Sequence, residues 1–275
     1  MVGAVLTATV IVGLMALSPL ARAAISPSQW FVQGPTRLLP APSGAQDHSG
    51  IAPSYGDRWF VVDNGDNDII EYQRNALDSW QIVRVLDLDD LLATPPEDME
   101  DITPMGPGEW ALLDERNSTI TAVQIPQFGN VVTEMWTASL MDDIPTTGED
   151  PDIDGIEGID WDEEASIGSI DVFWVVTERD AELFEVRLVN GNLVTVSDGV
   201  DLAADRASAV VKVPGEDAVY IVNNQSRTLH LNSLAGAALA SPRQLSMSQP
   251  EGAYLTAEPR LYIVCLLYTS DAADE

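Results

Sequence analysis

The chain has 275 residues, enough for one large domain or two small ones, and its hydrophobic content of 45% is ordinary for a globular protein that buries a core. Acidic residues outnumber basic ones by 44 to 13, and Lys212 is the only lysine. Such a surface repels nucleic-acid phosphates, so we expect no nucleic-acid partner. It suits cations instead, although solubility in salty surroundings is an alternative reason for the acidity.

Residues 1–24, MVGAVLTATVIVGLMALSPLARAA, are predicted to be a signal peptide, because the apolar run ends in small residues with an Ala-Arg-Ala cleavage site at 21–23. No Lys or Arg precedes the run, and an uncleaved membrane anchor is the alternative. Cleavage would leave residues 25–264 as a secreted or periplasmic domain with no stable membrane insertion, expected to be a monomer.

One sequence pattern appears five times, with repeat starts near residues 47, 98, 155, 206 and 249. Periods of about 50 residues indicate repeated supersecondary units. The aligned apolar positions are Ile51, Ile102, Ile159, Val210 and Ala253.

Each repeat is predicted to form four short antiparallel strands. In each repeat a short apolar strand comes first. A polar turn then leads to a second strand such as WFVV, WALL, FWVV or VYIV. Alternating apolar residues and β-branched or aromatic side chains favour strands throughout. The predicted fold class is therefore all-β, a β-propeller of five four-stranded blades with the last blade truncated; a β-sandwich is the alternative.

The fifth repeat ends too early for a complete blade. We expect it to lack its third strand, which would weaken closure of the ring. The N-terminal stretch at 28–39, SQWFVQGPTRLL, is expected to supply the outer strand of the last blade and to cover an exposed edge.

Residues 265–275, CLLYTSDAADE, match the translation of a transposase adapter used in short-read sequencing. We interpret this tail as non-native read-through and leave it out of the fold prediction. Without Cys265 the chain has no cysteine, so no disulfide or thiol chemistry is expected.

Three pieces of the repeats, DMEDI…WALLDERN, GIEGI…FWVVTERD and QPEGA…LYIV, occur in order at blade spacing. They resemble the SdiA-regulated family of bacterial β-propellers, distant relatives of NHL-repeat proteins. The resemblance covers residues 47–264 and implies a five-bladed propeller, a bound calcium ion and no established enzymatic activity. The fourth repeat departs from it with Ser208-Ala209 in place of Ser-Gly, and the fifth lacks the polar loop after LYIV.

Acidic residues recur at two positions of the repeats. Glu157 precedes the first strand of its repeat and Glu178 follows the second, so the hairpin places both at one end. Glu100 and Glu115 are the equivalent pair of the second repeat. Because innermost strands converge on the channel, these oxygens are expected to ring its mouth. The other candidate ligands are Glu251 of the fifth repeat, Asp63 and Asn64 of the first, and Asn223 and Asn224 of the fourth.

Carboxylates held close together need a cation, shared protons or water. Calcium fits an all-oxygen site, whereas two histidines and no native cysteine make zinc a poor choice. The alternative is a set of solvated loop acids. A second calcium loop is less favoured: the DPDIDG segment at 150–155 opens like an EF-hand loop but has Trp161 at its twelfth position.

No catalytic motif is evident. His48 and Ser49 are adjacent without a G-x-S-x-G elbow; His48 either lines the channel mouth or is an ordinary loop residue. His230 is expected to be structural, and Trp161 either packs or contacts a ligand.

The favoured function is a secreted or periplasmic calcium-binding module for an unknown protein or cell-envelope ligand. The alternatives are a calcium-dependent hydrolase of lactonase or esterase type, with the metal in the channel mouth, and a structural module that the metal only stabilises.

Overall fold

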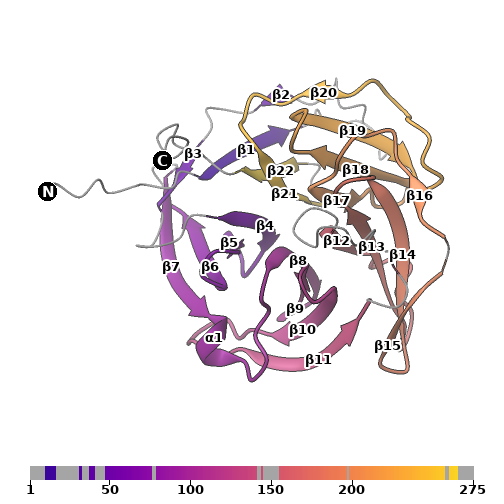
Figure 1. The fold of residues 1–275 in the computed structure, drawn as a ribbon. Coiled ribbons are helices and arrows are strands. Elements are labelled where there is room, and N and C mark those ends of the chain that lie inside the picture. The colour runs from indigo at the N-terminus through magenta and orange to yellow at the C-terminus, as the bar shows by residue number, and fades with distance from the viewer. Residues whose placement is uncertain are drawn as a thin grey trace, which may run out of the picture.

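The computed structural model describes residues 10–16, 31–32, 37–40, 47–75, 79–140, 144, 155–196, 198–257 and 260–265. Five β-sheets surround a common centre, with the first strand of each repeat innermost (Figure 1). The predicted β-propeller is confirmed. Within the described residues, no helix is long and apolar enough to cross a membrane.

The first four blades follow the predicted strand order, with the first four strands of each pairing antiparallel in sequence; in blade 3 an additional short strand, β16, also pairs with β14. Blade 1 ends in a short helix, α1 (Leu88–Leu91), which Asp87 caps by accepting from the N–H of Asp90. The strands are β4 (His48–Pro53), β5 (Arg58–Asp63), β6 (Asp68–Arg74) and β7 (Trp80–Asp87) in blade 1; β8 (Met99–Gly106), β9 (Glu109–Asp114), β10 (Thr119–Gln124) and β11 (Thr133–Ser139) in blade 2; β12 (Ile156–Trp161), β13 (Asp171–Thr177), β14 (Glu182–Val189), β15 (Asn192–Thr195) and β16 (Val200–Asp201) in blade 3; and β17 (Ala209–Lys212), β18 (Ala218–Asn223), β19 (Thr228–Ser233) and β20 (Arg243–Gln244) in blade 4.

Blade 5 combines both ends of the chain. Strands β21 (Pro250–Leu255) and β22 (Arg260–Cys265) form its inner hairpin, and β1 (Val10–Ala16) pairs antiparallel with β22 in the third place. Strands β2 (Phe31–Val32) and β3 (Arg37–Leu39) both pair with β1. The stretch at 28–39 thus supplies outer strands, as predicted, but the third place is taken by a strand from within the predicted signal peptide. Residues 266–275 lie outside the described part of the chain.

Hydrophobic clusters lie between the blades and join each one to its neighbours. Between blades 1 and 2, the Phe60 and Trp110 rings meet edge-on with centroids 5.0 Å apart. Between blades 5 and 1, the centroids of Trp59 and Tyr262 are 4.1 Å apart. Because both faces of each sheet are covered, the second strands are buried almost throughout. The innermost strands contact one another in ring order, and β21 closes the ring against β4.

The inner edges of these strands are satisfied by side chains from the preceding blade. The Asp101 carboxylate of β8 accepts from the N–H of Ile159 in β12 at 3.0 Å. The Asp160 carboxylate of β12 accepts from the N–H of Lys212 in β17 at 2.7 Å. An unpaired strand edge would leave buried donors without acceptors, so these bonds hold neighbouring blades together.

Glycine lets the first and last blades meet. A Cβ on Gly252 would lie 2.3 Å from the carbonyl oxygen of Ser49, which real atoms never reach. Blade 4 has Ala209 at this position, and the Cβ is accommodated in a fully buried site. There the Ser208 hydroxyl donates to the carbonyl of Pro250 at 2.7 Å and links blade 4 to blade 5.

Candidate functional site

Three glutamates enter the channel mouth from β-bulges. The register between first and second strands shifts around Glu100 in β8, Glu157 in β12 and Glu251 in β21. A bulge inserts an extra residue into one strand and re-aims its side chain. The shift in blade 1 spans Ser49, and Ser208 directly precedes β17 in blade 4. Each blade therefore contributes one polar residue at this level: Ser49, Glu100, Glu157, Ser208 and Glu251.

A second set of polar residues follows the second strand of four blades. Its members are Asn64, Glu115, Glu178 and Asn224. The N–H groups of Glu115 and Glu178 donate to the carbonyls of Asp98 and Gly155 at 2.9 and 3.1 Å, and blade 1 repeats this bond. The shared bond fixes both sets at one end of the hairpins, as the sequence analysis predicted for the Glu100–Glu115 and Glu157–Glu178 pairs.

The tightest grouping is in blade 2. Asp98, Glu100 and Glu115 each offer an oxygen within 4.8 Å of the other two. The Asn64 side-chain amide donates to Glu100 at 2.6 Å. The Glu115 carboxylate occupies the place that a Cβ on Gly155 would fill, so this glycine makes room for the acid.

Burial and mutual repulsion raise the pKa values of the central acids. The pKa of Glu157 lies well above its ordinary value because of burial and then repulsion from Glu100, Glu115 and other acids of the mouth. Burial also raises the pKa of Glu100 well above its usual range, with repulsion from Glu115 adding to it. The pKa of Glu251 is raised to about 8, mainly by burial. This concentration of negative charge favours either protons or a cation.

Two predicted ligands have partners in the mouth. The Arg206 guanidinium donates to Glu178 Oε1 at 2.8 Å and offsets its charge. The Asn224 amide donates to Glu251 Oε2 at 3.4 Å, which leaves the Asn224 carbonyl oxygen as a donor for a metal.

Asp63 occupies a different position from the other predicted ligands. It is the fully buried last residue of β5, and its Oδ1 accepts from the N–H of Asp66 at 3.1 Å. Asp114 and Asn223 make the same turn-capping bond in blades 2 and 4. The equivalent of Glu115 in blade 1 is Asn64. Burial raises the pKa of Asp63 to about 7, and its role as a metal ligand stays a prediction.

The histidines lie away from the glutamates. His48 is buried in blade 1 with Nε2 3.3 Å from the Tyr72 hydroxyl, and burial lowers its pKa to about 4. His230 Nε2 lies 2.8 Å from Thr228 Oγ1 in β19, a contact within one strand. The EF-hand-like interpretation depends on Asp150, Asp152 and Asp154, which lie outside the described residues.

The sequence analysis missed Asp98, Asp47 and Arg206. All three stand two residues before the bulge-level position of their blades. Repulsion from Asp98 contributes, after burial, to the raised pKa of Asp47, so these two acids extend the negative charge toward blade 1. The repeat alignment contained this signal, because Asp47 and Asp98 occupy matching places in DHSGI and DMEDI.

Solved structures similar to this chain include a glutaminyl cyclase from Myxococcus xanthus, at 10% identity and a TM-score of 0.52, with 82% of this chain and 93% of that chain covered. A chain in a nidogen–laminin complex matches at 9% identity and a TM-score of 0.50, over 93% and 84% of the two chains. A periplasmic gluconolactonase from Pseudomonas aeruginosa matches at 14% identity and a TM-score of 0.45, over 80% and 57%. At these identities the likeness concerns the fold alone.

A search of curated protein sequences found no significant match. The family model named SdiA-regulated matches residues 41–265, and the chain therefore belongs to the SdiA-regulated family.

Proposed function

We propose that this protein is a secreted or periplasmic calcium-binding propeller that presents a binding surface for a protein or cell-envelope ligand. The observation that carries the proposal is the convergence of Glu100, Glu157 and Glu251 on one channel mouth from three separate bulges. A cation among them would favour their ionised forms and so oppose the burial and mutual repulsion that raise their pKa values.

The donor set suits calcium. The ion takes roughly six to eight oxygen ligands in flexible geometry. Glu100, Glu157 and Glu251 would be its main ligands, with Glu115 and the Asn224 amide oxygen as further donors. Bound calcium would offset two of the negative charges of the mouth, tie blades 2, 3 and 5 together, and offer remaining coordination positions to an oxygen of the ligand.

A hydrolase would need a base, either an Asp or Glu of the ring or His48, and the position of His48 argues against the second. This imidazole, considered as a base beside the metal, contacts Tyr72 inside blade 1 and has its pKa lowered to about 4 by burial. The mouth offers carboxylates and amides, which suit a cation and a docked ligand. The calcium-dependent hydrolase remains the alternative that an activity assay must address.

Thermal melting with calcium, magnesium or a chelator tests the proposal. At free calcium about a hundredfold above Kd, ligand linkage stabilises the folded state by about 2.7 kcal/mol. For a domain of this size that corresponds to a rise in Tm of roughly 5–10 °C. An unchanged Tm with calcium and with chelator would overturn the calcium site.

Glu157→Gln is the matched variant, since it keeps the side-chain volume and removes one central charge. We expect at least about tenfold weaker calcium binding, which removes about 1.4 kcal/mol of the calcium-dependent stabilisation. Glu134→Gln is the control, because Glu134 is exposed on the outer strand β11. Wild type and Glu157→Gln are also assayed on lactones and esters. If wild type turns over a lactone or ester in the presence of calcium and Glu157→Gln does not, the hydrolase becomes the preferred function and the binding module is rejected.

A further inference from the structure

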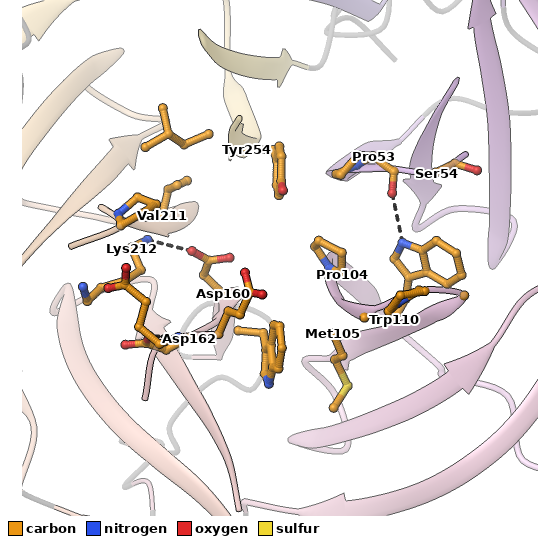
Figure 2. A pocket seen from close by; sticks show the side chains of 18 of the residues that line it. Pro53, Ser54, Pro104, Met105, Trp110, Asp160, Asp162, Val211, Lys212 and Tyr254 are labelled. Atoms are coloured by element: carbon orange, nitrogen blue, oxygen red, sulfur yellow. Dashed lines mark hydrogen bonds between the residues drawn. The ribbon is translucent and has the colours of Figure 1, made fainter. Parts of the chain in front are cut away.

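The end of the channel opposite the glutamates opens into a cavity of about 640 Å³. Every blade contributes residues from the far end of its innermost strand to the lining of the cavity. Figure 2 labels such residues from each of the blades. The five contributing residues are Pro53, Pro104, Asp160, Lys212 and Tyr254. The volume lies within the range of small-molecule sites.

Four aromatic residues contribute to the wall, Tyr55, Trp110, Trp161 and Tyr254, and the polar atoms of three of them are already bonded. The Trp110 indole N–H donates to the carbonyl of Pro53 at 3.0 Å (Figure 2). The Trp161 indole N–H donates to Asp171 at 3.2 Å, and the Tyr55 hydroxyl donates to the carbonyl of Ile125 at 2.5 Å. With these atoms occupied, the rings offer apolar and π surface to a ligand.

Tyr254 is the exception. Its ring packs edge-on against Trp59, and its hydroxyl points toward the open space near Asp160 (Figure 2). Within the described residues no hydrogen-bond partner is found for this hydroxyl. Burial raises the pKa of Tyr254 to about 12, and repulsion from Asp160 and Glu163 adds to it, so both acids lie near the phenol.

The lining of the cavity contains four acidic residues, Asp160, Asp162, Glu163 and Glu164, and one base. Lys212 is the one basic residue of the lining, and its ammonium donates to the carbonyls of Val213 and Glu216 at 3.0 and 2.5 Å. The Asp160 carboxyl accepts from the Lys212 backbone N–H; burial raises its pKa to about 7, and the charge of the Lys212 ammonium opposes that shift. Glu163 is exposed at the rim.

We propose that this cavity binds an organic cation: an ammonium or quaternary ammonium group carried on an apolar body. Aromatic faces attract such a cation through the ring quadrupole, and the excess of acids in the lining, with Glu163 exposed at the rim, supplies the opposite charge. Among the described residues, the acids of this lining form no group of three with ligand oxygens within 4.8 Å of one another, so an inorganic cation fits less well, and an anion would be repelled. The calcium proposal concerns the other mouth, so either proposal can fail alone.

Isothermal titration calorimetry with choline and its neutral carbon isostere, 3,3-dimethylbutan-1-ol, tests the charge requirement. The full chain is used in saturating calcium, so that the glutamate mouth cannot capture the probe. We expect choline to bind at least about tenfold more tightly than the alcohol, as a cation–π contact plus a carboxylate partner requires. Equal affinities, absence of choline binding, or tighter binding of neutral sugars would each overturn the proposal.

Variants locate the site. Glu163→Gln changes an exposed residue and is expected to weaken choline binding about threefold or more, whereas the exposed control Glu134→Gln leaves it unchanged. Tyr254→Phe keeps the π surface and is expected to retain binding, whereas Tyr254→Leu weakens it by about threefold to tenfold. Choline affinity that is unaffected by Glu163→Gln would refute this placement, whether or not Tyr254→Leu folds.

Discussion

Glu251→Gln should reverse its effect on stability when calcium is added. In the metal-free protein the Glu251 side chain is buried, and repulsion from Glu178 adds to the effect of burial; together they raise its pKa from 4.5 to about 8. As the pH rises, Glu251 therefore loses its proton at a lower pH in the unfolded chain than in the folded protein. The stability linked to this proton is fully present below about pH 4.5 and is lost as the pH rises through about 8.

The pKa difference sets the size of the effect. A rise from 4.5 to about 8 corresponds to about 5 kcal/mol against the ionised folded state at high pH. Glutamine has the same shape, carries no charge and keeps an oxygen that accepts from Asn224. In chelator at about pH 8.5, Glu251→Gln is therefore expected to be more stable than wild type by up to about 5 kcal/mol, or on the order of 10 °C in Tm. Near pH 5 the two should melt together.

Calcium should change which of the two proteins, wild type or Glu251→Gln, is the more stable. A bound ion favours the ionised glutamate, so wild type gains more from calcium than the variant does, by about 1.4 kcal/mol or more for a tenfold loss of affinity. The assay is thermal melting at the two pH values, with chelator and with calcium, beside the Glu134→Gln control. A variant less stable than wild type in chelator at high pH would refute the electrostatic reasoning. Equal calcium shifts would refute the role as ligand.

Three further outcomes follow from contacts between and within blades. Asp101→Ala leaves the buried N–H of Ile159 without its acceptor, and the free energy of unfolding in urea should fall by about 1–3 kcal/mol. Gly252→Ala places a Cβ 2.3 Å from the Ser49 carbonyl oxygen in the first blade's innermost strand, so Tm should fall by several degrees as blades 5 and 1 are forced apart; an unchanged Tm would contradict the observed closure. Arg206→Gln removes the partner of Glu178, so metal-free stability should fall while calcium affinity rises, and calorimetry that finds weaker calcium binding would refute the inference that Arg206 offsets negative charge at the mouth.

The candidate site was predictable in outline because a hairpin has simple geometry. The start of one strand and the end of its partner lie together, which is enough to pair Glu100 with Glu115 and Glu157 with Glu178. The partners of these acids were not predictable, because they come from other blades. Asn64 reaches Glu100 from blade 1, and Arg206 reaches Glu178 from blade 4. Sequence spacing within one repeat carries no information on such contacts.

Asp63 shows a second limit of the sequence. The sequence makes both Asp63 and Asn64 candidates at the end of the second strand, and the structure places Asp63 at the turn-capping position and Asn64 one residue later, where its amide reaches Glu100. Along a strand this single residue changes the face on which a side chain lies. The cavity at the other mouth was not foreseen, because its walls come from single residues of all the blades.

The sequence by itself determined the repeat, the alternation of its strands and hence the propeller, because hydrophobic periodicity is a local property that each repeat carries in full. It also determined that acids would gather at one end of the blades. Only the tertiary structure decided which acids meet, which one is neutralised by Arg206, and which strand takes the third place in blade 5. Those outcomes depend on bulges and on contacts between neighbouring blades, which form only when the ring closes and brings distant residues within a few ångströms of one another.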